Sequence, residues 1–297
     1  ERMKIAWADF ALISPDYWRK FLLDYESLGS DYKYGAMLTG HELEIIDKKL
    51  DLYMEQKARK GEMPHLLIDR FRFDSFQVSK DGNYTSSLLT RFGKRIFLFF
   101  VITPPAETVE RAWTRGLSTS RYKAVEDLLF HNIEAYTGMP ELFFSWMAIE
   151  DKEINFEFLD NSVKLGESPK TIAFGRIGVM FILDLSALNN VDTFRAVNVK
   201  AKKPEEVLTI NTDSDHFFIE NCFLKIPKLI LIDSETCEIF GESLQGEWVY
   251  KKISYIPKNK LEKNCLEAIG WLTTLVKDEG LKPSYSIEHE RELTLGS

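Results

Sequence analysis

The sequence predicts an α/β fold, in which a mostly parallel sheet flanked by helices is followed by a smaller α+β module. Three observations predict it. Strand-like and helix-like segments alternate through the first half of the 297 residues. Two of the strand-like segments are uninterrupted apolar runs, as expected for strands buried on both faces. After about residue 151, short strand-like segments follow one another around a single long helix. We therefore expect a first domain over residues 1–190 and a C-terminal module over residues 191–297.

The first half opens with a strand and two helices. Residues 3–9 form an apolar run that we expect to be a buried strand ending at Asp9. Residues 14–28 have the pattern of a helix, with Ser14 at the N-cap position and a proline in the first turn. Residues 41–61 carry apolar side chains at helical spacing, acidic residues early, basic residues late and a glycine at the end. This pattern predicts a long amphipathic helix.

Two apolar strands and two further helices come next. Residues 64–69 form a short strand that ends at Asp69, and residues 94–103 form a second strand that two prolines terminate. Residues 106–116 and 120–147 are expected to be helices, separated by the small-residue segment Gly-Leu-Ser-Thr-Ser. Strands and helices in this alternating order are typical of parallel βαβ units.

The second half is expected to contain a hairpin and then the C-terminal module. A turn-forming Asn-Ser pair separates residues 154–160 from residues 163–167, so we expect these two segments to be the arms of the hairpin. Residues 177–188 form another apolar segment. Beyond residue 191, further strand-like segments precede a final helix at residues 259–280.

Composition and charge exclude several classes of protein. The chain has 38 basic and 46 acidic residues and a net charge of -8 at pH 7, which argues against a general nucleic-acid or membrane-surface binder. Any anion site is therefore expected to be local. The three cysteines are widely spaced and form no CxxC pair, so neither a disulfide framework nor a metal site is indicated. No apolar run approaches the roughly 20 residues that span a bilayer, and no leader opens the chain, so we expect a cytoplasmic protein.

The first candidate site residues are Asp9 and Asp69, because ligands bind at the carboxyl ends of the strands in open α/β sheets. A carboxylate there can accept a proton from a substrate hydroxyl or hold the hydroxyl in place. The alternative is that each aspartate caps the turn or helix that follows it. Arg70 and Arg72 come directly after Asp69 and alternate with phenylalanines. They are candidates for substrate binding or, alternatively, for ion pairs that pack this segment onto the sheet.

Three arginines, Arg111, Arg115 and Arg121, lie around the small-residue segment of a chain that is acidic overall. The guanidinium group offers a planar set of donors that matches phosphate oxygens. Two helices with a flexible break between them suit a lid that closes over a transferred phosphoryl group. The alternative is a solvated helix face, on which Glu107 and Glu110 offer ion-pair partners to Arg111 and Arg115.

The order of these elements resembles the zeta-toxin group of P-loop kinases over roughly residues 3–190. The resemblance is carried by the strand end at Asp9 and by the segments YGAMLTGHELEIIDKKL, HLLIDRFR, IFLFFVITPPAETVERAWTRG, SRYKAVEDLLFHNIEAYTGMPELF and INFEFLDNSVKLGE. It implies a P-loop kinase-like fold and a kinase that transfers the γ-phosphate of ATP, with Mg²⁺, to a hydroxyl of UDP-N-acetylglucosamine or a related UDP-sugar. Many members of the group are bacterial toxins, which implies a toxin or effector role and, with it, delivery into a target cell.

The resemblance also implies residue roles. Asp9 matches the base on the substrate hydroxyl, Asp69 matches a ligand of the sugar nucleotide, and arginines in the positions of Arg111 and Arg121 bind the ATP phosphates. The candidate site residues are therefore, for catalysis, Asp9, Arg111 and Arg121; for substrate binding, Asp69, Arg70 and Arg72; and for ATP binding, Arg115 and Arg121.

The sequence departs from the family at the phosphate loop, whose pattern is GxxxxGK[ST]. The nearest spacing match, residues 35–42, has His41 and Glu42 in place of the lysine and the hydroxyl residue. The simplest explanation is that the first strand and the loop lie upstream of Glu1. The alternatives are a relative that has lost the loop and acts as a binding protein, and a protein whose biology resides in a protein-interaction module at residues 191–297.

Overall fold

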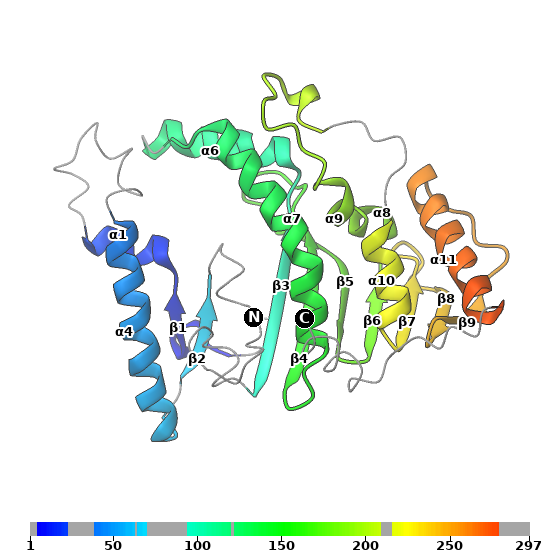
Figure 1. Cartoon of the computed structure of the whole chain (residues 1–297), viewed down its shortest axis with the longest axis horizontal. Coiled ribbons are helices and arrows are strands. Elements are labelled where there is room, and N and C mark those ends of the chain that lie inside the picture. Colours follow the sequence, from blue (N-terminus) through cyan, green and yellow to red (C-terminus); the bar gives the residue numbers. More distant parts are fainter. Residues whose placement is uncertain are drawn as a thin grey trace. The chain divides into compact units, whose positions relative to one another are not determined.

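The computed structural model describes residues 5–22, 39–62, 64–69, 94–119, 122–208 and 216–278 of the chain. The chain divides into two compact units (Figure 1). The first comprises residues 1–93 and 112–123, and the second comprises residues 94–111 and 124–297.

The first unit contains a two-stranded parallel sheet and two described α-helices. Its described elements, in chain order, are the short 3₁₀ helix η1 (Trp7–Asp9), β1 (Phe10–Ile13), α1 (Pro15–Leu22), α4 (Gly40–Arg59) and β2 (His65–Ile68). Strands β1 and β2 pair from Phe10 opposite His65 to Ile13 opposite Ile68. Ile13 and Met54 are buried where α4 packs on the sheet. The long helix predicted at residues 41–61 and the short strand predicted at residues 64–69 are confirmed.

The end of α4 shows why the amphipathic pattern stops where it does. Basic residues occupy the last turn, where they interact favourably with the helix dipole. Gly61 follows with a φ of +70°, a left-handed conformation that glycine adopts without the steric penalty of a side chain. The helix therefore ends at the predicted glycine.

The second unit is built on one seven-stranded sheet. In spatial order, which is also chain order, its strands are β3 (Arg95–Ile102), β4 (Glu153–Asp160), β5 (Lys170–Arg176), β6 (Val179–Ile182), β7 (Lys228–Ile232), β8 (Ile239–Leu244) and β9 (Glu247–Lys251). Only the β3–β4 and β6–β7 pairs are parallel. The other four pairs are antiparallel, so the predicted mostly parallel sheet is wrong. Short connections within β4–β5–β6 and β7–β8–β9 allow only antiparallel pairing, whereas helical crossovers precede β4 and β7.

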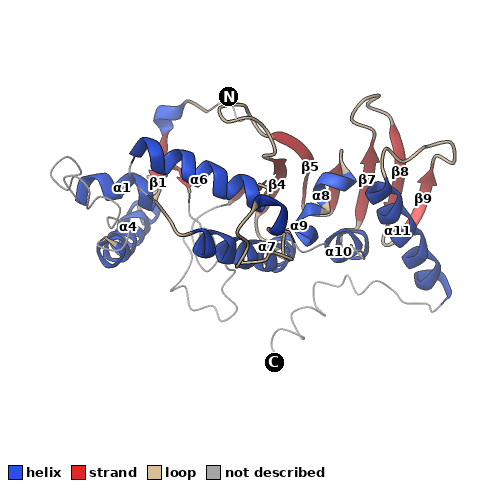
Figure 2. Ribbon diagram, turned by 90° about the horizontal axis from the view of Figure 1, so that it is seen from above, coloured by secondary structure: helices blue, strands red, loops and turns tan. Residues whose placement is uncertain are grey.

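Helices connect or follow the strands of this sheet in the chain. They are α6 (Pro105–Thr119), α7 (Val125–Met147), α8 (Leu185–Leu188), α9 (Asn190–Thr193), the 3₁₀ helix η4 (Pro204–Glu206), α10 (Phe217–Lys225) and α11 (Lys260–Asp278). Figure 2 shows α7 and α10 on the same side of the strands. Phe143 of α7 meets Phe100 and Phe158 of the sheet edge-on, with ring centroids 5.7 and 5.1 Å apart, and Phe218 of α10 joins the same cluster. These aromatic contacts form the core.

Strand β3 departs from the prediction of a strand buried on both faces. Its residues alternate between exposed and buried, with Phe97, Phe99 and Val101 exposed. It is also an end strand of the described sheet rather than a central one. A strand covered on one side normally alternates apolar and polar residues, but the exposed positions of β3 are apolar too, so its sequence resembles that of a strand buried on both faces.

The predicted boundary at residue 190 does not separate the compact units. Strands β6 and β7, on either side of it, are hydrogen-bonded neighbours in one sheet. The predicted hairpin is also corrected, because the strand after β4 is β5, and residues 163–167 form a loop instead. None of the helices among the described residues is long and apolar enough to cross a bilayer.

Candidate functional site

A cluster of polar side chains lies where β3 and β4 end. Because the two strands are parallel, their carboxyl ends meet at one edge of the sheet, the edge at which α/β proteins bind ligands. Thr103 follows β3, Asp160 ends β4 and Asn161 follows it, while Arg111 comes from α6 and Tyr136 from α7. We call these five residues the strand-end cluster.

Tyr136 and Asn161 tie the end of β3 to its surroundings. The Tyr136 hydroxyl donates to the carbonyl oxygen of Thr103 and accepts from its backbone N–H, both at 2.8 Å. The Asn161 amide donates to Thr103 Oγ1 at 3.1 Å, and its backbone N–H donates to the Ile102 carbonyl at 2.8 Å. Burial, and secondarily the nearby Asp160 carboxylate, raise the pKa of Tyr136, although the Thr103 backbone hydrogen bond opposes the shift. The hydroxyl therefore stays protonated and serves as a structural bridge.

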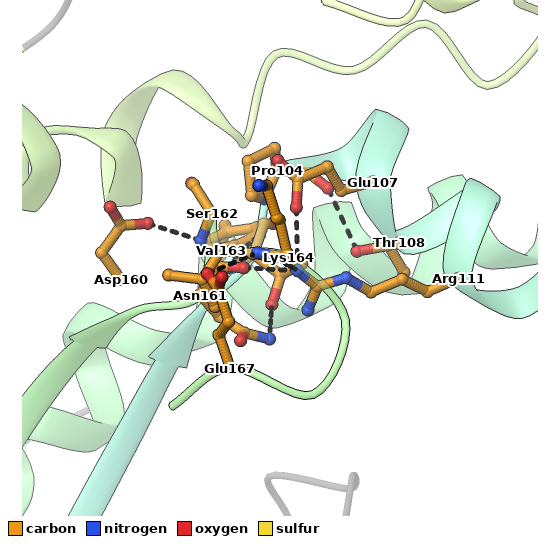
Figure 3. Close-up of polar contacts among 12 residues, drawn as sticks. Pro104, Glu107, Thr108, Arg111, Asp160, Asn161, Ser162, Val163, Lys164 and Glu167 are labelled. Carbon is orange, nitrogen blue, oxygen red and sulfur yellow. Dashed lines mark hydrogen bonds and ion pairs between the residues drawn. The ribbon is translucent and has the colours of Figure 1, made fainter. Parts of the chain in front are cut away.

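Arg111 fixes the loop that follows β4 (Figure 3). Its Nη2 donates to the carbonyl oxygens of Asn161 and Val163 at 2.7 and 2.6 Å. The same nitrogen pairs with the Glu107 carboxylate at 3.0 Å, one helical turn earlier. Nη2 carries two hydrogens and serves three acceptors, so this end of the guanidinium is fully engaged. Arg111 therefore holds α6 against the loop.

The loop itself closes through its own polar groups. The Ser162 N–H donates to Asp160 Oδ1 at 2.9 Å, and the Lys164 N–H donates to Glu167 Oε2 at 3.2 Å. Gly166 has a φ of +92°, which a side chain would strain. With its carbonyls turned toward Arg111, this segment forms a compact turn rather than the second arm of a hairpin.

The helix break expected at Gly116–Ser120 begins later than predicted. Helix α6 runs through Gly116 to Thr119. A Cβ at Gly116 would lie 2.5 Å from Cδ1 of Tyr122, so the glycine makes room for the tyrosine ring. We find that Gly116 is a packing position within a helix, and the predicted hinge at that residue is wrong.

The structure describes only two of the three lid candidates. Arg111 pairs with Glu107, as the solvated-face alternative expected, and also binds backbone carbonyls. Arg115 is exposed on α6. Arg121, and the substrate candidates Arg70 and Arg72, lie outside the described residues.

Asp9 and Asp69 lie at opposite ends of the two-stranded sheet. Asp9 belongs to η1 and precedes β1, whereas Asp69 follows β2. The prediction that Asp9 ends a strand is therefore wrong. Asp69 is level with Ser14 in the sheet, five residues along the chain from Asp9. At the rise per residue of a strand, the two aspartates are about 16 Å apart. The apolar residues before Asp9 form no described strand, since the chain pairs only from Phe10.

Ser14, rather than Asp9, accompanies Asp69 at the carboxyl end. The Asp69 N–H donates to the Ile13 carbonyl at 2.9 Å, which continues the sheet pairing by one residue. Ser14 is 5% exposed, and its hydroxyl lies 3.5 Å from Asp69 Oδ2 and donates toward it. Asp69 itself is exposed. A carboxylate held in this way at the end of parallel strands can accept a proton or a hydrogen bond from a bound hydroxyl.

Sequence reasoning missed four members of the strand-end cluster. Asp160 ends a strand, and Thr103 and Asn161 each come directly after one, so the rule that selected Asp69 could have selected these three as well. Tyr136 lies in the middle of α7 and carries no such signal. Its role depends on packing of α7 against the end of β3.

The described residues fit an ATP site only in part. Arg115 could meet phosphate oxygens, but the sequence has no phosphate loop. Among the described residues, no group of three or more histidine, cysteine, aspartate or glutamate side chains is arranged to hold a metal ion.

Comparisons with protein-family models, curated proteins and solved structures find no match to this chain.

Proposed function

We propose that this chain is part of an ATP-dependent small-molecule kinase that phosphorylates a hydroxyl of a UDP-sugar, such as UDP-N-acetylglucosamine, or of a related metabolite. The observation that carries the proposal is Asp69, an exposed carboxylate at the carboxyl end of a parallel strand pair, beside the buried Ser14 hydroxyl. Ligand hydroxyls are bound at such strand ends in α/β proteins. The resemblance to the zeta-toxin group supplies the reaction class, and with it a toxin or effector role.

Asp69 takes the part that was assigned to Asp9. A carboxylate next to a hydroxyl donor is oriented, and it can hold the acceptor hydroxyl or take up its proton. Asp9 lies at the other end of β1 and has no place in this arrangement. Position alone therefore selects Asp69 over Asp9.

The arginines of the α6 region divide into two roles. Arg111 is a positioning residue, because its Nη2 is occupied by two carbonyls and a carboxylate. Arg115 and Arg121 are proposed to place positive charge near the phosphates, where guanidinium groups neutralise developing negative charge.

A binding or interaction protein without catalysis is the second candidate. It is favoured by the absence of a phosphate loop from the sequence and by the structural engagement of Arg111. An interaction role for residues 191–297 alone is less favoured, because β7, β8 and β9 complete the sheet that β3 begins.

The kinase proposal is tested on the natural full-length gene product with ATP, Mg²⁺ and a panel of UDP-sugars. Loss of a positioned general base typically costs 10²–10⁴ in rate, so we expect Asp69→Asn to lower turnover by about 100-fold or more. Asp9→Asn is the matched control, an exposed aspartate at the opposite end of the same sheet, and should change turnover less than about threefold. Turnover that survives Asp69→Asn and is abolished by Asp9→Asn would contradict the assignment. ATP binding without any turnover would favour the second candidate.

A further inference from the structure

Trp113 of α6 and Tyr122, which lies beyond the end of that helix, form an exposed pair of aromatic rings in the first unit. Trp113 is 56% exposed and Tyr122 is 44% exposed. Their ring centroids lie 5.3 Å apart with an interplanar angle of 51°. Two exposed rings held against each other form an apolar patch, and exposed apolar patches often mark binding surfaces.

The ring contact depends on the glycine at position 116. This glycine lies one turn after Trp113 on α6 and has no side chain between the helix and the Tyr122 ring. A Cβ there would come within 2.5 Å of Cδ1 and 2.6 Å of Cε1 of Tyr122. Glycine destabilises a helix more than any other residue except proline. Here its missing side chain allows Tyr122 to lie beside Trp113.

The charge around the pair selects the kind of ligand. Arg115 is exposed on α6 two residues after Trp113, and the exposed Lys123 directly follows Tyr122, although the chain carries a net charge of -8. Aromatic rings stack on planar heteroaromatic groups, and arginine and lysine attract phosphate. A ligand that combines both features is a nucleotide.

We propose that Trp113 and Tyr122 form a stacking platform for the base of a mononucleotide. The choice of a nucleotide over other aromatic anions rests on the proposed function. The platform adds to that function a binding site for the base of a nucleotide substrate. Stacking on aromatic side chains is tolerant of base identity, since every base has a π face. The platform is therefore expected to accept both a purine and a pyrimidine nucleotide.

The test is isothermal titration calorimetry of the chain with uridine monophosphate, adenosine monophosphate and ribose 5-phosphate, without Mg²⁺ or a phosphoryl acceptor. Loss of one stacking contact typically weakens binding about five- to a hundredfold. We expect both nucleotides to bind about tenfold or more tightly than ribose 5-phosphate, which has no base. Trp113→Ala and Tyr122→Ala should each remove most of that difference, and Trp113→Phe should restore it. Trp271→Ala, which removes another exposed tryptophan, should leave it unchanged.

Three results would overturn the platform. They are equal affinities for the nucleotides and ribose 5-phosphate, unchanged nucleotide affinity in Trp113→Ala, and much tighter binding of a single-stranded oligonucleotide that depends on the same residues. These readouts are separate from turnover. Nucleotide binding through Trp113 without phosphoryl transfer would support the platform and contradict the kinase proposal. Phosphoryl transfer with an unchanged KM for the nucleotide substrates in Trp113→Ala would support the kinase proposal and contradict the platform.

Discussion

Replacing Arg111 with alanine removes the contacts that hold the loop after β4 to α6. The side chain is 25% exposed and donates to two carbonyls at 2.7 and 2.6 Å. Hydrogen bonds from a charged donor contribute about 1.5–3 kcal/mol each, but at this exposure water replaces part of the loss. The Glu107 ion pair adds at most about 0.5 kcal/mol, because both partners are partly solvated. We expect Arg111→Ala to lower the free energy of unfolding by about 2 kcal/mol in total.

Arg111→Lys separates charge from geometry. Lysine keeps the positive charge and the chance to pair with Glu107, but its single ammonium group lacks the planar set of donors that serves two carbonyls and a carboxylate. We expect about half the loss of the alanine variant, about 1 kcal/mol.

Thermal unfolding and amide hydrogen exchange measure these effects. For a unit of this size, 1 kcal/mol shifts Tm by about 2–4 °C, so Arg111→Ala should lower Tm by about 4–8 °C. Exchange should accelerate at Ser162 and Lys164, whose N–H groups close the loop. The control is Arg95→Ala, since Arg95 and Glu153 form an ion pair in which both side chains are 68% exposed. Equal Tm shifts in the two variants, with unchanged loop exchange, would refute the reasoning.

Two further predictions concern buried groups of the second unit. Tyr136→Phe removes a hydroxyl that bonds both backbone groups of Thr103 and should cost about 1–3 kcal/mol in urea unfolding; an unchanged midpoint would contradict the bridge. Burial raises the pKa of Cys265 to about 12 and that of Cys222 above its ordinary value near 9.0. Both thiols therefore stay protonated in the folded state. In the unfolded chain the same thiols ionise near pH 9, so their contribution to the free energy of unfolding is full below that pH and declines as the pH rises above it. Ellman's reagent at pH 8 should accordingly modify the exposed Cys237 alone in the folded protein, and rapid modification of Cys265 would contradict the burial.

The sequence predicts β2, β3, β4 and the long helices, because each is an apolar pattern between clear boundaries, but it misplaces β1 and β5. Gly61 ends α4, and the prolines at 104 and 105 end β3. Strand direction could not be predicted in this way. Phe97 and Phe99 are apolar on the exposed face of β3, so the strand had the pattern of one buried on both faces.

The site was only partly predictable for a related reason. The pairing of Arg111 with Glu107 follows from their spacing of four on a helix. The carbonyls of Asn161 and Val163 are about 50 residues away in the chain and become partners only through tertiary packing. Asp9 was misplaced because apolar residues lie on both sides of it, and only those after it pair with β2.

Phosphoryl transfer by the natural full-length gene product tests the central claim most directly. With ATP, Mg²⁺ and UDP-sugars, the wild-type protein should form a phosphorylated sugar nucleotide. Asp69→Asn should lower the rate by about 100-fold or more, and Asp9→Asn should leave it nearly unchanged. Absence of any phosphorylated product across the panel, or full activity in Asp69→Asn, would contradict the claim.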